Sequence, residues 1–355
     1  MKKKINLIII LSLIITFSAL KAQVNFQEGT FQQMVEKAKS ENKILMVDFF
    51  TDWCKWCVEL DMKVYSDPQV AAFANKNFIS YKIDAEKGEG IALKDKYNVP
   101  GYPTILFLKD DGVEVDRIVG YFHADKFLQI IKDYNAGINT FDFLKAKLKE
   151  NPNDIISNYK IGEKLVDLES KDEAKPYFQK ITEVDQDNTS GYLDDATLYI
   201  AYINGDNESI NKFEDQFPKS DRIKDSYLFL AEVYSTKYKD YDNAEKTYAK
   251  AFDKFGKDDK DVGEAYGQYL LDRIYATAMI KDATSENLKT GLEICEKCLI
   301  YVKGSIHEAS VYYCEATIYN NLGNKDKANE AIDKAIKIHD KKAFRDLKEK
   351  INAKI

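Results

Sequence analysis

The sequence predicts a two-part protein in which a mixed α/β domain is followed by an all-helical solenoid. Strand and helix signals alternate over residues 24–136, which is typical of a mixed central sheet with helices on both faces. A C-x-x-C motif stands where one apolar strand-like run gives way to a helix. From about residue 141 the pattern is helical throughout, and paired helices recur with a period of about 34–40 residues, as in a solenoid.

The first 22 residues have the pattern of a signal peptide. Three lysines follow Met1, and residues 7–20 form an almost wholly apolar run that is short for a membrane span. We expect cleavage after Ala22, although Leu20 is larger than the residue usual at that place; an uncleaved N-terminal anchor is the alternative. The pattern predicts export, with the periplasm as the expected compartment and no membrane span after cleavage.

Charge and cysteine content narrow the function classes. The signal peptide carries four lysines and no acidic residue, so its removal changes the net charge from −7 to −11. An acidic chain without a basic stripe argues against nucleic-acid binding. Five cysteines are too few for a disulfide-built scaffold, so both parts must rest on apolar cores.

Each element of the N-terminal part has a local signal. Apolar residues recur at helical spacing from Phe31, and Asp67 with Pro68 is a typical helix N-terminus. The turn at 110–112 lies between two apolar runs and predicts a β-hairpin, and Gly137 is a typical helix stop. The expected strands cover residues 44–50, 78–84, 104–108 and 113–119, and the expected helices cover residues 31–38, 58–64, 68–75, 90–97 and 124–134.

The motif Cys54-Lys55-Trp56-Cys57 predicts redox chemistry. A helix N-terminus carries partial positive charge, which stabilises a thiolate on Cys54, and Lys55 adds positive charge nearby. The thiolate is the attacking species in disulfide exchange, and the spacing brings Cys57 within reach of a mixed disulfide on Cys54. We therefore expect Cys54 to be an exposed nucleophile and Cys57 a more buried resolving thiol. A structural zinc site needs two further ligands, and this part of the chain offers only His123.

Further features stand around this motif in a fixed order. They are the acid Asp48, the segment Tyr65-Ser66-Asp67-Pro68-Gln69-Val70, the lysine Lys82, and the loop Gly101-Tyr102-Pro103-Thr104. With the motif, they make residues 30–135 resemble the thioredoxin-fold family, and in particular exported, thioredoxin-related bacterial proteins. The dipeptide Lys55-Trp56 differs from the Gly-Pro of thioredoxin. Because this dipeptide helps to set the redox potential, reductase, oxidase and isomerase remain alternatives.

The resemblance implies chemical roles for two residues besides the cysteines. Asp48 matches the family's buried acid; burial raises the pKa of a carboxyl group and would let it take the proton of Cys57. Lys82 matches the lysine that approaches this acid. For Asp48, a strand-end turn or cap residue is the alternative interpretation.

The resemblance also implies a client-binding edge. Pro103 matches the family's cis-proline, which would expose the backbone of Tyr102 for strand-like pairing with a client. Pro100 is the alternative cis residue. Trp53 and Trp56 are expected to contact the client or to pack, and Trp56, inside the dipeptide, is the stronger candidate for client contact.

The helical part resembles tetratricopeptide repeats over most of residues 150–340. The residues at the family's packing positions are Tyr312, Ala316, Tyr319, Ala328, Ile332 and Ala335 in the last unit, and Tyr227, Ala231, Tyr234, Ala244, Tyr248 and Ala251 in an earlier one. Residues 141–150 are expected to form a connecting helix, and residues 341–355 a helix that caps the stack.

Three more cysteines, Cys295, Cys298 and Cys314 (the solenoid cysteines), lie in this helical part. The first two form a C-x-x-C pattern inside a helical run rather than at a strand-to-helix junction. Buried free cysteine behaves as a small apolar residue, so we expect all three to fill core positions. A disulfide between Cys298 and Cys314 is the alternative.

Together the patterns predict a signal peptide (1–22), an α/β thioredoxin-fold domain (24–138) and an all-α, tetratricopeptide-like solenoid (139–355). The expected function is that of an exported thiol–disulfide oxidoreductase that needs no metal and no cofactor besides its redox disulfide. Its expected partners are protein thiol and disulfide clients, an upstream redox partner, and a peptide or protein ligand on the repeats. The alternative is an envelope scaffold or chaperone-like interaction protein in which the repeats carry the main function.

Overall fold

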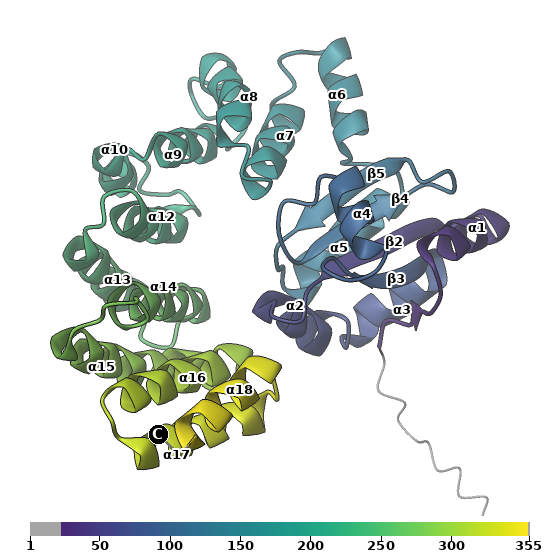
Figure 1. Cartoon of the computed structure of the whole chain (residues 1–355). Helices are drawn as coiled ribbons and strands as arrows, with labels where there is room; N and C mark the ends of the chain where they lie inside the picture. Colours follow the sequence, from purple (N-terminus) through teal and green to yellow (C-terminus); the bar gives the residue numbers. More distant parts are fainter. Residues whose placement is uncertain (1–22, 354–355) are drawn as a thin grey trace, which may run out of the picture.

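A computed structural model describes residues 23–353, so the predicted signal peptide (1–22) lies outside the described residues. The chain folds into a sheet domain followed by an arc of helices, and the far part of this arc returns to the sheet domain (Figure 1). Among residues 23–353, none of the helices is both long and apolar enough to span a bilayer.

The sheet is mixed and has five strands in the order β1-β3-β2-β4-β5. The strands are β1 (Phe26–Gln27), β2 (Ile44–Phe50), β3 (Phe78–Asp84), β4 (Thr104–Leu108) and β5 (Glu114–Val119). β3 is parallel to β1 and β2, whereas β4 is antiparallel to β2 and β5. The predicted strands and the hairpin are confirmed; β1 has only two residues and was not predicted.

Helices cover both faces of the sheet, as expected. They are α1 (Phe31–Glu41), α2 (Lys55–Glu59), the π-helix η1 (Leu60–Val64), α3 (Pro68–Asn77), α4 (Gly90–Lys96) and α5 (Ala124–Asn135). Side chains alternate along β2, so Leu45 packs with α1 on one face and Met46 packs with η1, α3 and α5 on the other. Asp48 is two residues beyond Met46 and therefore points to the face that η1 covers.

The helical arc consists mainly of antiparallel pairs. Its helices are α6 (Phe141–Glu150), α7 (Ile155–Asp167), α8 (Lys171–Val184), α9 (Leu193–Asn204), α10 (Asn207–Asn211), α11 (Phe213–Gln216), α12 (Ile223–Thr236), α13 (Tyr241–Phe255), α14 (Lys260–Ala278), α15 (Ser285–Val302), α16 (Ile306–Asn321), α17 (Lys325–Ile338) and α18 (Lys342–Asn352). The expected connecting helix is α6. In the expected capping helix α18, Phe344, Leu347 and Ile351 are buried against α17.

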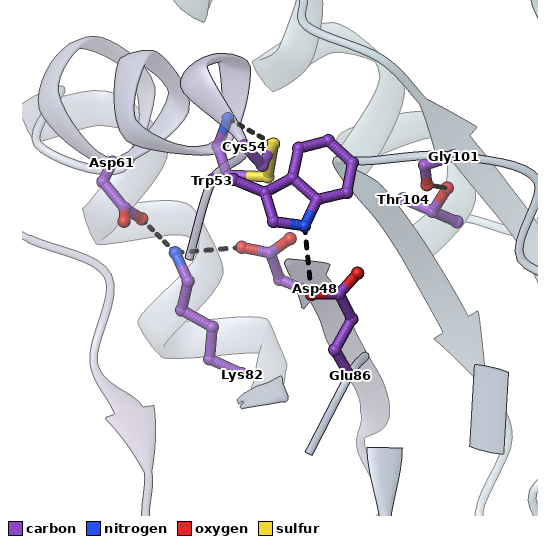
Figure 2. The surroundings of a disulfide bond; sticks show 9 residues. Asp48, Trp53, Cys54, Asp61, Lys82, Glu86, Gly101 and Thr104 are labelled. Carbon is purple, nitrogen blue, oxygen red and sulfur yellow. Dashed lines mark hydrogen bonds and ion pairs between the residues drawn. A yellow bond between two sulfur atoms is a disulfide. The ribbon is translucent and has the colours of Figure 1, made fainter. Parts of the chain in front are cut away.

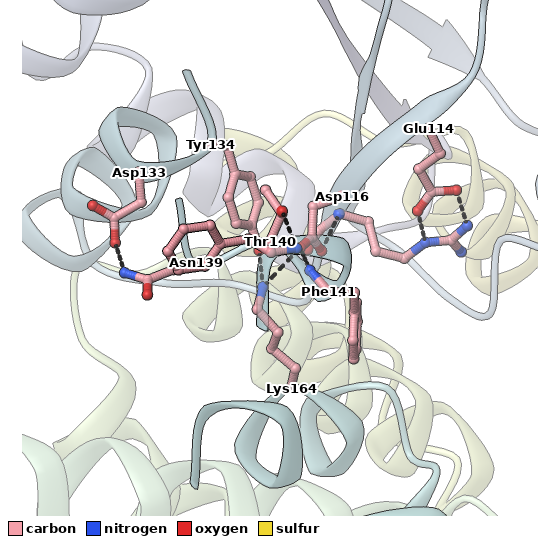
Figure 3. A network of polar contacts seen from close by, with 10 residues as sticks. Glu114, Asp116, Asp133, Tyr134, Asn139, Thr140, Phe141 and Lys164 are labelled. Carbon is pink, nitrogen blue, oxygen red and sulfur yellow. Dashed lines mark hydrogen bonds and ion pairs between the residues drawn. The ribbon is translucent and has the colours of Figure 1, made fainter. Parts of the chain in front are cut away.

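The solenoid is attached to the sheet domain at its start. Asp116 of β5 is 3% exposed and forms an ion pair with Lys164 of α7 at 3.1 Å. Its carboxylate also accepts a hydrogen bond from the backbone amide of Phe141, at the first residue of α6, at 2.9 Å (Figure 3). Lys164 donates to the hydroxyl of Tyr134 as well. These buried contacts fix the direction in which the helical arc leaves the sheet.

The solenoid contacts the sheet domain a second time, far along the chain. α16 packs against α2, so the arc closes into a ring (Figure 1). The sequence patterns did not predict this contact. It brings the solenoid beside the C-x-x-C motif.

Candidate functional site

Cys54 and Cys57 are joined by a disulfide at the start of α2. Cys54 is the N-cap residue, and its sulfur accepts a hydrogen bond from the backbone amide of Cys57 at 3.1 Å. The prediction of an exposed nucleophile is wrong for this disulfide form, because Cys54 is only 4% exposed and Cys57 2%. The disulfide holds the Cys54 side chain against the first turn of the helix.

A buried ion pair lies below the disulfide (Figure 2). Asp48 of β2 and Lys82 of β3 are direct partners in the parallel register, and the Lys82 ammonium lies 3.1 Å from the Asp48 carboxylate. Asp48 is fully buried, and burial raises its pKa, although the charge of Lys82 opposes this shift. Burial alone would lower the pKa of Lys82, but the carboxylates of Asp48 and Asp61 raise it. The two residues therefore meet as the resemblance implied.

The Trp53 side of the motif faces solvent. Trp53 is 61% exposed, and its ring donates a hydrogen bond to Glu86 at 3.0 Å (Figure 2). The ring lies edge-on to Tyr102, with 5.8 Å between the ring centroids. The Tyr102–Pro103 peptide bond is cis, which confirms the choice of Pro103. The hydroxyl of Thr104 donates to the carbonyl of Gly101 at 2.7 Å and closes this loop.

The Trp56 side of the motif faces the solenoid. Trp56 stacks on Tyr121 at 5.4 Å and lies edge-on to His307 of α16 at 4.7 Å. Lys55 donates a hydrogen bond to Gln268 of α14 at 2.8 Å. Burial lowers the pKa of Lys55. The roles expected for Trp53 and Trp56 as client contacts stay predictions, but their surroundings are opposite.

Glu59 is a functional candidate that sequence reasoning missed. It lies two residues after Cys57, is 2% exposed, and accepts a hydrogen bond from the backbone amide of Ile306 at 2.8 Å. Its other carboxylate oxygen pairs with Lys63 at 2.7 Å. The sequence offers no signal for this contact, because 247 positions separate Glu59 from Ile306.

The solenoid cysteines are free thiols buried in α15 and α16, as the core-packing interpretation expects. The thiol of Cys298 donates a hydrogen bond to the carbonyl of Gly267 at 3.4 Å. Burial raises the pKa of Cys298 and of Cys314 to about 12. Such thiols are protonated at neutral pH and are poor nucleophiles.

Comparison with known proteins identifies both parts of the chain. Residues 31–135 match the family model of the thioredoxin-like domain, and residues 156–188 and 304–341 match that of the tetratricopeptide repeat. The two tetratricopeptide segments correspond to the helix pairs α7–α8 and α16–α17. The chain therefore carries a thioredoxin-like domain followed by tetratricopeptide repeats, and both resemblances are confirmed.

Individual relatives are similar to one part of the chain or the other. The chain is 34% identical over 112 residues to the thiol:disulfide interchange protein DsbD of Tatumella citrea, and the matched segment covers 30% of this chain and 19% of the relative. The chain thus spans about a fifth of the length of such curated relatives. A provisionally assigned disulphide isomerase from Bacteroides thetaiotaomicron is 40% identical, covering 33% of this chain and 96% of that one with a TM-score of 0.31. The tetratricopeptide protein YrrB is 19% identical; the match covers 58% of this chain and 97% of YrrB, with a TM-score of 0.33.

These findings define the chemistry that the site supports. A thioredoxin-like domain with a Cys54–Cys57 pair at a helix N-terminus supports thiol–disulfide oxidoreductase activity.

Proposed function

We propose that this protein is an exported thiol–disulfide oxidoreductase that acts on protein disulfides through Cys54 and Cys57. The observation that carries the proposal is the position of the pair in a thioredoxin-like domain. Cys54 caps α2, and a backbone amide of the same helix already points at its sulfur. Since α2 continues into η1, the helix carries enough aligned peptide dipoles to favour a thiolate on Cys54.

Reduction of a client disulfide proceeds in two balanced steps from the dithiol form. The Cys54 thiolate attacks one client sulfur; the client S–S bond breaks, a mixed disulfide forms, and the other client sulfur leaves as a thiolate that takes up a proton. The Cys57 sulfur then attacks Cys54, which releases the second client thiol and restores the Cys54–Cys57 disulfide. Two electrons pass to the client, and a dithiol partner must return them. The same steps in reverse would oxidise a client.

Asp48 acts as the proton acceptor in the second step. Burial raises its pKa, so the carboxyl group holds and releases a proton closer to neutral pH than a solvated aspartate does. The ammonium of Lys82 compensates the negative charge of the deprotonated Asp48 carboxylate in the core. Deprotonation of the buried Cys57 thiol requires such a local base, because bulk solvent has little access to a residue that is 2% exposed.

The tetratricopeptide repeats dock a client or a redox partner. Two observations support this role: repeats of this family match at both ends of the arc, and the arc brings α14 and α16 directly beside the redox motif. A ligand held by the repeats would thus lie close to Cys54. Export rests on the signal-peptide pattern of residues 1–22.

Trapping of a mixed disulfide tests the proposed function. In the full-length protein, Cys57→Ser leaves Cys54 able to attack but removes the resolving sulfur. We expect the reduced form of this variant to accumulate a mixed disulfide with insulin whose disulfides are intact, and this mixed disulfide should disappear on addition of dithiothreitol. The matched variant Cys54→Ser should trap nothing and should lose insulin reduction. Trapping by Cys54→Ser but not by Cys57→Ser would reverse the roles, and trapping by neither would contradict the proposal.

A further inference from the structure

The two tryptophans beside the redox pair have opposite surroundings. Trp53 is 61% exposed beside Tyr102, whereas Trp56 is enclosed by Tyr121 and by His307 of the solenoid. Burial lowers the pKa of His307 to about 4, so its ring is neutral at pH 7 and packs against Trp56 without a charge to hydrate. One flank of the disulfide is therefore open and the other is covered by the same chain.

The covering contact is built from specific polar groups. The first backbone amides of a helix have no partner within the helix, and a carboxylate there also benefits from the helix dipole. Glu59 supplies that carboxylate to α16 through Ile306, the first residue after the N-cap Ser305. Lys55 reaches Gln268, whose amide in turn donates to Asp272 at 2.7 Å. We call this set of contacts the clasp: Lys55, Trp56 and Glu59 on one side, and Gln268, Ile306 and His307 on the other.

The ring should open at the clasp rather than at the other attachment of the solenoid. Cavities of similar size border both: about 150 Å³ at the clasp, lined by Trp56, Glu59 and His307, and about 130 Å³ at the other attachment, lined by Tyr134, Phe141 and Lys164. The difference lies in the connection. At the other attachment the chain itself joins α5 to α6, and the buried Asp116 holds both Lys164 and the start of α6. The clasp has only non-covalent contacts.

We propose that the clasp restricts approach to Cys54 to the Trp53–Tyr102 side, and so favours clients whose disulfide lies in a protruding or small segment. This inference rests on the proposed function. Cys54 is only 4% exposed, and α14 and α16 stand where a bulky client would otherwise cover the Trp56 flank. Glu59 is then a positioning residue that sets client selectivity through α16, and Trp56 contacts the solenoid rather than the client.

Two variants open the clasp from opposite sides. Glu59→Ala removes the carboxylate. Ile306→Pro removes the donating amide and also replaces the Ile306 side chain, which is 4% exposed. Proline is tolerated at the first helical position, and Ser305 before it is already extended. Lys63→Met is the matched control, since Lys63 pairs with the same carboxylate from within the thioredoxin-like domain. Circular dichroism confirms that each variant is folded, and small-angle scattering reports ring opening as an increased radius of gyration.

The measurement compares the rates at which the protein, first reduced to its dithiol form with dithiothreitol that is then removed, reduces a bulky probe, insulin, and a small one, oxidised glutathione. We expect both clasp variants to raise the insulin-to-glutathione rate ratio by about tenfold, which corresponds to about 1.4 kcal/mol, near the lower bound for a charge-assisted hydrogen bond. The control should keep the wild-type ratio. An unchanged ratio in both clasp variants overturns the proposal, whether or not scattering shows an open ring. A wild-type protein that reduces neither probe contradicts the proposed function itself.

Discussion

Replacement of Asp48 by asparagine removes a buried charge while keeping the shape of the side chain. In the native protein, Asp48 is fully buried and shares the Lys82 ammonium with the partly exposed Asp61. Burial raises the pKa of Asp48, so the folded protein binds this proton more tightly than the unfolded chain does. By linkage, stability is therefore lost as pH rises from the ordinary value of an aspartate through the folded value. Asparagine has no proton to lose, so the variant should not show this loss.

The structure also sets the size of the effect. A pKa difference of one unit between the folded and unfolded states corresponds to about 1.4 kcal/mol. A buried polar group with incomplete compensation costs roughly 1–3 kcal/mol. We therefore expect the free energy of unfolding of Asp48→Asn to exceed that of the wild type by about 1–3 kcal/mol at about pH 8. The two should converge below about pH 3, where Asp48 is protonated in both states of the wild type. Disulfide exchange by the variant should be slower near neutral pH, because Cys57 loses its proton acceptor.

Urea unfolding of the full-length protein measures this difference. Trp53 and Trp56 are the two tryptophans of the chain and both lie at the redox motif, so their fluorescence reports on the thioredoxin-like domain. Asp61→Asn is the control: it contacts the same lysine, but its side chain is 42% exposed, and we expect a change below about 1 kcal/mol. Parallel pH profiles of the wild type and Asp48→Asn would refute the reasoning.

Two further predictions concern the solenoid. In Gly162→Ala, the new methyl group would lie 2.7 Å from the fully buried ring of Phe178. Overpacking should cost about 1–3 kcal/mol, more than the roughly 1 kcal/mol gained in helix propensity. Thermal unfolding should therefore show a variant that is less stable than the wild type. In Gly263→Ala, the new methyl group would lie 3.8 Å from its nearest neighbour, the Tyr301 ring, so this variant should gain up to about 1 kcal/mol of stability. Stability changes of the same sign in both variants would contradict this packing argument. After reduction, a thiol reagent should modify Cys54 quickly, because the helix N-terminus favours its thiolate, and the three solenoid cysteines only on unfolding; fast modification of a solenoid cysteine in the folded protein would show that α15 and α16 do not shield it.

Local features of the sequence predicted the elements of the sheet domain. β2 and β3 are apolar runs buried on both faces, so a single stretch of sequence suffices to mark each strand. The Asp67 side chain accepts hydrogen bonds from the amides of Gln69 and Val70, and Pro68 begins α3, because capping depends only on neighbouring residues. β1 escaped prediction, since two residues carry no periodic pattern and pair with β3 only in the folded sheet.

At the redox site, too, some features were predicted from the sequence and others were not. The resemblance to the thioredoxin-fold family implied that Asp48 meets Lys82 and that Pro103 is cis, and both are observed. The burial of Cys54 was not predicted, since the exposure of a side chain depends on everything that packs around it.

The sequence by itself determined the strands, the caps, the redox pair and the repeated helix pairs, because each of these is encoded over a few residues or in a regular period. The tertiary structure alone decided that the helical arc closes onto α2, so that Glu59 meets Ile306 and Trp56 meets His307. The physical reason is cumulative geometry: each helix pair turns the arc by a small angle that its packing sets. The sum of these angles over the whole solenoid determines which residues finally meet, and no local pattern records that sum.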